Sequence, residues 1–295
     1  MTRMLSLLLV LVAAPLGLAA QVLLETDPVV PVRGTLFRLR VNPTADGPVD
    51  AIGGEVASEP LHFDRGDGVF WSALAAAPID GGDSLPVLLA VRRGETTDTI
   101  RVAIATGAGS YRSEKLSVAP SMAEPDSAAE ARIAEDNARA RAVSREAHQT
   151  PRLWEPPLAR PRPTRVTSGF GTARVFNGRV ASRHMGTDFS GAIGAPVRAA
   201  ARGRVALVAD FYLAGHVVYL DHGQGLVTAY FHLSRTLVKP GEIVERGQQI
   251  GAVGRSGRVT GPHLHWIMRY GRVTVDPLAA MALLDRPAGT SAPAQ

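Results

Sequence analysis

Two short stretches carry side chains whose types and spacing could do chemistry. The stretch TGPHLHW holds His263 and His265 two positions apart, and RHMGTDFSG holds His184 four positions before Asp188. In an extended strand, side chains two or four positions apart project from the same face. We therefore expect each pair to converge. His232, in YFHLS, adds a further imidazole at the end of a strand-like run.

An imidazole–carboxylate pair with one further imidazole is sufficient to hold a catalytic zinc ion. The chain has no cysteine, so thiolate ligands and a cysteine nucleophile are excluded. Three nitrogen and oxygen ligands leave a fourth position to water, whose pKa falls to about 7. Two spare imidazoles could then move the proton and stabilise the oxyanion of an amide under hydrolysis. Spacing alone does not decide which histidines are ligands and which are spare.

The alternative interpretation is that each motif is a chance match, because short motifs have high false-positive rates. Their combination in one β-rich segment, with a third histidine after a strand, favours a metal site. We interpret His216 and His222, which flank one strand in AGHVVYLDHGQG, as structural. His148 ends a predicted helix, where an imidazolium suits the helix dipole. His62 stands alone in a strand-rich region and is also interpreted as structural.

The elements that must position these side chains are mainly β. From Val166 onward, short β-branched runs such as GRVALVAD and GLVTAYFHLS are separated by glycines, which predicts an antiparallel β domain. The only helix-length periodic stretch in this part is Leu278–Leu284.

The sequence pattern of residues 21–118 predicts a small, immunoglobulin-like β-sandwich. In LFRLRV, Phe37, Leu39 and Val41 alternate with arginines, and TIRVAIA repeats this two-residue period. Turn signals such as Asp46-Gly47 separate such runs at the spacing of a sandwich.

The segment between the two β regions changes character. SAAEARIAEDNARARAVSREAH, from Ser127 to His148, should be helical, with Ser127 and Glu130 forming a capping box. Its large apolar residues are few, so we expect it to lie on a surface rather than to form a core. The following stretch, TPRLWEPPLARPRPT, carries five prolines and predicts a stiff linker, which Trp154 could pin to a neighbouring domain.

The first twenty residues, MTRMLSLLLVLVAAPLGLAA, predict an export signal. A positive Arg3 precedes an apolar run that is broken by Pro15 and followed by a small pair, Ala19-Ala20. The alternative is an uncleaved N-terminal anchor. We expect the protein to work outside the cytoplasm, in the periplasm or cell envelope.

Charge is spread unevenly along the chain. The net charge is +5, but residues from 166 onward hold 14 Arg and Lys against 7 Asp and Glu. A basic C-terminal half suggests an anionic partner such as a membrane surface or an acidic wall polymer. Nucleic acid is the least expected anionic partner, and we predict no nucleic-acid binding, because the chain is expected to be exported, its aromatic content is only 5%, and no nucleic-acid motif is present.

The ordered motifs between Val166 and Leu278 resemble those of the lysostaphin-type (LytM-like) zinc metallopeptidases, which are murein endopeptidases. The resemblance is carried by SGFGTARVFNGRVASRHMGTDFSG, YLDHGQGLVTAYFHLS and VTGPHLHW, in that order. The preceding signal, β-sandwich and helix also resemble envelope members of that family. The resemblance implies a compact antiparallel sheet, a groove floored by the metal, and the peptide cross-links of peptidoglycan as substrate.

The resemblance also implies roles for five residues. It gives His184, Asp188 and His265 as the zinc ligands. It gives His232 and His263 as the two non-ligand histidines, which position the attacking water, shuttle its proton or steady the oxyanion.

The chain departs from the family pattern at two places. Ile267 stands where many members have an acidic residue, and this position is not a metal ligand. Some members use a tyrosine shortly before the HxxxD motif, and residues 166–183 contain none. The arginines near the motifs are interpreted either as contacts to wall carboxylates or as solvated loop charges: Arg174, Arg179, Arg183 and Arg258.

We therefore expect an exported zinc metalloendopeptidase that hydrolyses peptidoglycan cross-links. The first alternative is a non-catalytic module that binds or activates other wall hydrolases, and the second is a biotinyl-like carrier domain suggested by GEIVERGQQIGAVG. Two further interactions are left open: a regulatory protein that binds the N-terminal domain, and a peripheral association with the envelope. The predicted division is a signal peptide (1–20), a β-sandwich (21–118), a helix with a Pro-rich linker (119–165), a peptidase domain (166–280) and a tail (281–295).

Overall fold

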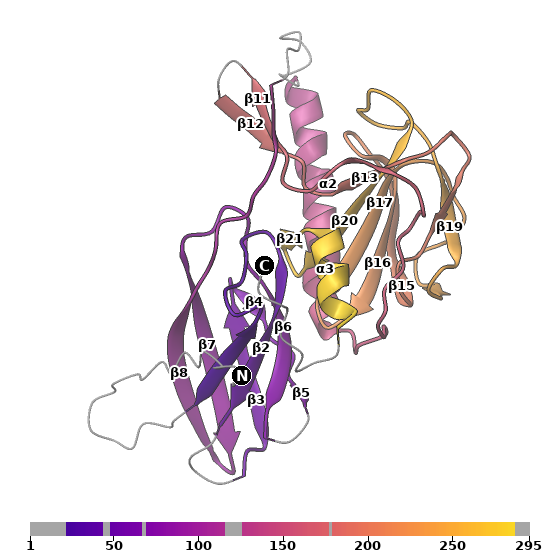
Figure 1. The fold of residues 1–295 in the computed structure, drawn as a ribbon. Coiled ribbons are helices and arrows are strands. Elements are labelled where there is room, and N and C mark those ends of the chain that lie inside the picture. The colour runs from indigo at the N-terminus through magenta and orange to yellow at the C-terminus, as the bar shows by residue number, and fades with distance from the viewer. Residues whose placement is uncertain (1–21, 44–47, 67–68, 116–125, 177–178, 287–295) are drawn as a thin grey trace, which may run out of the picture. The chain divides into compact units, whose positions relative to one another are not determined.

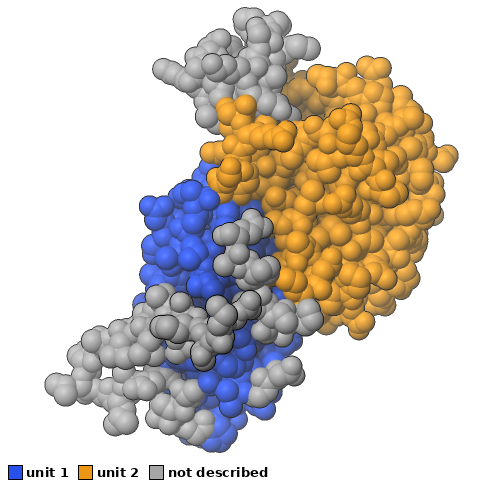
Figure 2. Space-filling model, viewed as in Figure 1, with its two compact units in different colours: residues 1–108, 287–295 blue, residues 109–286 orange. Residues whose placement is uncertain are grey.

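The chain forms two compact units, the first ending at Ala108 and the second running from Gly109 to Arg286 (Figures 1 and 2). This computed structural model describes residues 22–43, 48–66, 69–115, 126–176 and 179–286. The predicted export signal lies outside these ranges. No helix within them is long and apolar enough to cross a membrane.

The first unit is built from two four-stranded antiparallel sheets. One sheet has the order β1-β2-β6-β5 and the other β4-β3-β7-β8. The strands are β1 Leu23–Asp27, β2 Leu36–Asn42, β3 Ala51–Val56, β4 Glu59–Pro60, β5 Asp64–Arg65, β6 Trp71–Ala76, β7 Ser84–Arg93 and β8 Thr96–Ala105.

The two-residue period predicted from the sequence is seen in the burial of β7 and β8. Phe37, Leu39 and Val41 of β2 are fully buried, and Ile104 of β8 joins them in one apolar cluster. Both sheets contribute to that cluster, so the predicted N-terminal β domain is confirmed as an all-β unit.

The second unit, here called the C-terminal unit, holds the predicted site residues. Its strands are β9 Ser113–Lys115, β10 Val166–Ser168, β11 Ala173–Phe176, β12 Arg179–Arg183, β13 Thr187–Ser190, β14 Pro196–Arg198, β15 Gly203–Phe211, β16 Gly215–Gly223, β17 Leu226–Thr236, β18 Ile243–Val244, β19 Gln249–Val253, β20 His263–Tyr270 and β21 Val273–Val275. Its helices are α2 Ser127–Glu146, the 3₁₀ helix η1 Ala147–Gln149, and α3 Pro277–Leu284.

Ten of these strands form one sheet, with β10-β13-β20-β17-β16-β15-β18 as its main path. Strand β19 pairs with β14 and with the end of β17, and β21 pairs with β20. All of these pairings are antiparallel, as predicted. A separate small sheet, β12-β11-β9, contains a parallel pair between β11 and β9.

Helix α2 lies along one face of the large sheet (Figure 1). Ala140 and Val143 pack with Tyr219, Val227 and other strand residues in one apolar cluster. The prediction that this helix does not contribute to a core is therefore wrong. Ala140 of α2 and Ala147 of η1 contribute small side chains to this contact, which allow the helical segment to approach the sheet closely.

Two helix ends are set by aspartates. The N-cap of α2 is Asp126, whose Oδ1 accepts from the backbone N–H of Ala129 (2.8 Å), rather than the predicted Ser127. Asp126 precedes the predicted cap by one residue and offers a charged acceptor at the positive end of the helix dipole. Helix α3 begins after Asp276, which accepts from Leu278 N (2.9 Å).

The Pro-rich stretch packs against the C-terminal unit along its length. Trp154 and Leu158 are buried. Leu153 N donates to His222 O (2.8 Å), and Ala159 N donates to Ala200 O (2.7 Å). The prolines keep this stretch out of the sheet, as predicted, but its backbone is held there by hydrogen bonds.

Candidate metal centre

The three predicted ligands come from two neighbouring strands and a bend. Asp188 of β13 lies directly opposite His265 of β20 in the strand register, so the two side chains share one face. His184 lies in the connection between β12 and β13 and does not share a strand with Asp188. The connection is held by two backbone hydrogen bonds, from Gly171 N to His184 O (2.7 Å) and from His184 N to Thr172 O (2.9 Å).

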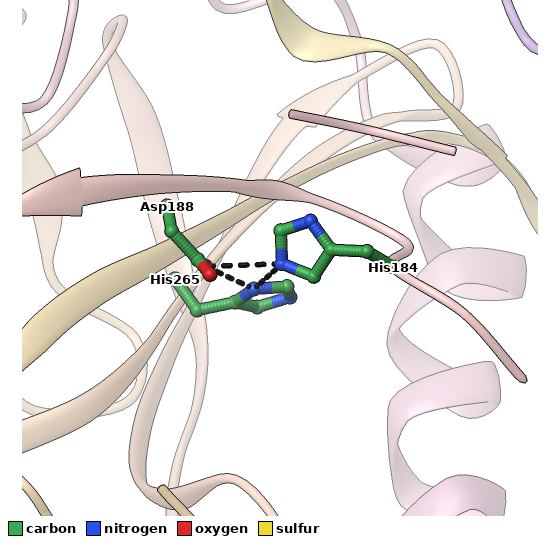
Figure 3. A group of neighbouring side chains, drawn as sticks. All are labelled: His184, Asp188 and His265. Carbon is green, nitrogen blue, oxygen red and sulfur yellow. Dashed lines mark hydrogen bonds and ion pairs between the residues drawn. The ribbon is translucent and has the colours of Figure 1, made fainter. Parts of the chain in front are cut away.

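The ligand atoms converge on one point, as Figure 3 shows. His184 Nε2 lies 3.1 Å from Asp188 Oδ1 and 3.0 Å from His265 Nδ1. His265 Nδ1 lies 2.8 Å from the same carboxylate oxygen. Ligands about 2.0–2.1 Å from a tetrahedral zinc ion are separated by about 3.3 Å, so the three atoms are already near the required spacing.

The hydrogen bond on the far side of His184 fixes which of its nitrogens is free. Nδ1–H donates to Gly169 O (2.8 Å), which leaves the lone pair of Nε2 directed at Asp188 and His265. A backbone carbonyl that orients an imidazole in this way is typical of metal sites.

The protonation states of Asp188 and His265 also suit the binding of a cation. Burial alone would raise the pKa of Asp188, but the neighbouring imidazoles of His184 and His265 hold it below its ordinary value. Burial lowers the pKa of His265, against the opposing effect of the Asp188 carboxylate. At neutral pH, Asp188 is therefore an anion and His265 a neutral imidazole, which are the forms that bind metal.

Among the described residues, this is the one group of three histidines, cysteines or carboxylates close enough to hold an ion together. Its side chains are only 5% (His184), 11% (Asp188) and 12% (His265) exposed. Two imidazoles and one carboxylate match the donor set that zinc prefers at catalytic sites, so the residues present fit the predicted ion.

The two predicted non-ligand histidines lie beside this cluster. His263 Nε2 is 3.7 Å from Asp188 Oδ1, and His263 Nδ1–H donates to Gly261 O (2.9 Å). The ring centres of His263 and His232 are 5.0 Å apart. The structure thus brings all five predicted residues into one group.

His232 is held in one neutral form. Burial, with a smaller effect from His265, lowers its pKa to about 4. Its Nδ1–H donates to Ser256 O (2.9 Å), so Nε2 is the nitrogen left to accept a proton. At neutral pH the ring is therefore uncharged and able to act as an acceptor.

The other histidines interpreted as structural have structural contacts. His222 is fully buried, with Nδ1–H donating to Arg202 O (2.8 Å) and Nε2 bonded to the Thr228 hydroxyl (2.8 Å). His216 donates from Nδ1 to Leu233 O (3.1 Å). Neither belongs to the ligand cluster.

Of the residues near the motifs that the sequence analysis named, the structure describes the side chains of some and not of others. Ile267 is buried in the apolar cluster beneath α2. Arg258 is exposed in the loop before β20, whereas the side chains of Arg174 and Arg179 lie outside the described part of the chain.

The sequence reasoning missed the backbone carbonyls that orient the imidazoles. They belong to Gly169, Ser256 and Gly261. Every residue has a backbone carbonyl, so the amino-acid type does not reveal which carbonyls orient a histidine. The only available signal is that each lies in a glycine-containing loop, namely SGFG, GRSG or TGPH.

Comparison with known proteins identifies the family of this domain. Residues 182–277 match peptidase family M23. The peptidoglycan DD-endopeptidase ShyA from Vibrio cholerae is 46% identical over 104 residues, which are 35% of this chain and 24% of ShyA. ShyB, a peptidoglycan DD-endopeptidase from the same organism, is 42% identical over 117 residues, covering 39% of this chain and 27% of ShyB.

A solved structure matches more of the chain. A Pseudomonas aeruginosa protein assigned to peptidase M23 superposes with a TM-score of 0.65 at 28% identity. The match covers 87% of this chain and 96% of that one. The chain thus spans only about a quarter of the curated relatives but nearly all of this neighbour. Residues 182–277 of the chain, which include every residue of the His184–Asp188–His265 cluster, therefore form a domain of peptidase family M23, a metallopeptidase family.

Proposed function

We propose that this chain is an exported zinc metalloendopeptidase that hydrolyses the peptide cross-links of peptidoglycan. The observation that carries the proposal is the cluster itself. Three ligand atoms lie 2.8–3.1 Å from one another, and two further imidazoles stand beside them. This arrangement suits metal-assisted hydrolysis of an amide bond.

His184, Asp188 and His265 are the proposed zinc ligands. When bound there, zinc acts as a Lewis acid and makes water acidic enough to serve as a nucleophile near neutral pH. The buried position of the three side chains excludes competing solvent from most of the site.

His232 and His263 are the proposed proton-handling groups. Both donate Nδ1–H to a backbone carbonyl, so both have Nε2 available. An imidazole in this form accepts a proton at Nε2 and, once protonated, delivers it to the departing amine or hydrogen-bonds to a developing oxyanion. Two such groups, 5.0 Å apart between ring centres, provide for both tasks.

The substrate is proposed from the relatives and from charge. ShyA and ShyB are peptidoglycan DD-endopeptidases. In this chain, Arg255 and Arg258 are exposed in the loop between β19 and β20, close in sequence to the carbonyl that holds His232. Exposed cations beside the site suit a polymer that carries free carboxylates.

The non-catalytic alternative predicts an incomplete ligand set. All three ligand positions and both non-ligand histidines are present here, which supports an enzyme over a binding module. The N-terminal unit remains the proposed site of wall attachment or of a regulatory partner.

The test is zinc-dependent digestion of purified cell-wall sacculi by the full chain. We expect zinc-loaded protein to release soluble muropeptides, a chelator to stop the release, and added zinc to restore it. Protein that binds sacculi and retains zinc but releases nothing would instead support the binding module. An Asp188→Asn variant is the matched control, because it keeps the shape of the side chain and removes the ligand charge.

A further inference from the structure

His232 lies at an irregular point of β17. Strand β17 pairs with β20 as far as Phe231 and with β19 from Leu233 onward. Its register with β16 also shifts here, between Tyr230 and Leu233. Such a bulge re-aims side chains beside functional sites. The imidazole of His232 therefore points where a regular strand would not place it.

The backbone of His232 is in the left-handed region, with φ 60°. A residue other than glycine persists in this conformation only where its surroundings hold it. One restraint is the hydrogen bond from His232 N to Ala214 O (2.9 Å), in the turn between β15 and β16. A second is the hydrogen bond from the ring Nδ1–H to Ser256 O (2.9 Å).

Ser256 is fixed to the same two strands by its side chain. Its hydroxyl donates to Leu233 O (2.8 Å) and accepts from His216 N (2.9 Å). Leu233 and His216 are register partners on β17 and β16, next to the bulge. The hydroxyl thus links both strands, while the carbonyl of the same residue receives the imidazole of His232.

The loop around Ser256 is packed too closely to accept larger neighbours. A Cβ added to Gly215 would lie 2.2 Å from Ser256 Oγ. A Cβ added to Gly257 would lie 2.4 Å from Gly215 N and 2.5 Å from Leu213 O. Both glycines also have positive φ, 63° and 73°. The GRSG loop and the β15–β16 turn are therefore in backbone contact, with the Ser256 hydroxyl between them.

We propose that Ser256 is a positioning residue that fixes the orientation and tautomer of His232. The proposal rests on the proposed function in assigning proton transfer to His232. Without the hydroxyl, the Ser256 carbonyl is no longer tied to β16 and β17. The imidazole then loses its single orientation, and Nε2 is no longer always the accepting nitrogen.

The test compares Ser256→Ala, Ser256→Thr and Ser234→Ala in the full chain. Ser234 is the matched control, because its hydroxyl also donates to a backbone carbonyl, but to Ala252 O (3.3 Å) rather than to a strand residue beside the bulge. For each variant we would measure the zinc content of the protein, and kcat and KM with a purified cross-linked muropeptide dimer as substrate. Long-range ¹H–¹⁵N NMR of the imidazoles would report the tautomer of His232.

Ser256→Ala should lower kcat by about ten- to a hundredfold, with zinc content and KM nearly unchanged. Its His232 signals should change from a single Nδ1–H tautomer to a mixture. Ser256→Thr, which keeps a hydroxyl, should retain most of the turnover, and Ser234→Ala should resemble the unsubstituted protein.

The proposal is overturned if Ser256→Ala keeps full kcat, or if it loses zinc in proportion to activity. It is also overturned if His232 in the unsubstituted protein carries its proton on Nε2, a result that does not require any variant to fold. If the unsubstituted protein fails to cleave the dimer while the NMR change on Ser256→Ala is seen, the proposed function fails and the positioning of His232 stands.

Discussion

At the scale of single residues, the two histidines of HLH have different surroundings. His265 Nδ1 is within 3.0 Å of both other ligand atoms, whereas His263 Nε2 is 3.7 Å from Asp188 and its other nitrogen is bound to Gly261 O. The sequence predicted that both rings share a face, because they are two positions apart in a strand. Strand spacing alone did not reveal the asymmetry, which only the family resemblance predicted; in the structure it comes from the facing position of Asp188 on β13.

This asymmetry predicts separable effects. His265→Ala should weaken zinc binding by more than about 100-fold, because it removes a ligand rather than a supporting contact. His263→Ala should keep the metal and lose about 10²- to 10⁴-fold in turnover. Zinc analysis of dialysed protein, together with kcat on a cross-linked dimer, measures both. Equal loss of zinc in the two variants would contradict the assignment.

At the scale of elements, the sequence pattern predicted the strands better than it predicted which segments pack against the sheets. Phe37, Leu39 and Val41 alternate with arginines and form the buried face of β2. Helix α2 was predicted as a helix, but its packing was not, because Ala140 and Ala147 make close contacts without a strong apolar period. Likewise, the five prolines after η1 excluded regular structure there but did not reveal that Trp154 is buried.

The buried His222 predicts how the C-terminal unit responds to acid. Burial lowers its pKa, against opposing effects of Arg202 O and Asp221. An unfolded chain binds this proton near pH 6.5, and the folded chain binds it only at lower pH. The contribution of His222 to the free energy of unfolding should therefore be constant above about pH 6.5 and fall below it by up to about 1.4 kcal/mol per pH unit, in addition to the contributions of His232 and His265, whose pKa values are also lowered.

Denaturation of zinc-free protein at several pH values measures this slope. A Trp71→Phe background leaves Trp154 and Trp266, both in the C-terminal unit, as the fluorescent reporters. His222→Gln should reduce the slope between pH 6.5 and 5, whereas the control His216→Gln, at a half-exposed position, should not. Identical slopes in His222→Gln and the unsubstituted protein would show that His222 does not control this response.

At the scale of the whole molecule, the structure predicts which fragment folds. The C-terminal unit begins at Gly109, well before the predicted domain start at Val166. A fragment of residues 166–286 would expose the sheet face that α2 covers and would lose the contacts of Trp154 and Leu158. A fragment of residues 109–286 keeps all of them.

We therefore expect the longer fragment to unfold cooperatively and bind zinc, and the shorter one to aggregate or melt at a much lower temperature. Calorimetry with and without zinc measures both. A stable, zinc-binding fragment of residues 166–286 would show that α2 and the Pro-rich stretch are dispensable. The activity of the longer fragment relative to the full chain would then report whether the N-terminal unit inhibits.

The most direct test of the central claim is mass spectrometry of a defined cross-linked muropeptide dimer digested by the zinc-loaded full chain in heavy-oxygen water. The account predicts two monomers, with one heavy oxygen in the newly formed carboxylate, and no product when zinc is removed. An intact dimer, in the presence of fully zinc-loaded and folded protein, would contradict the claim that this site hydrolyses the cross-link.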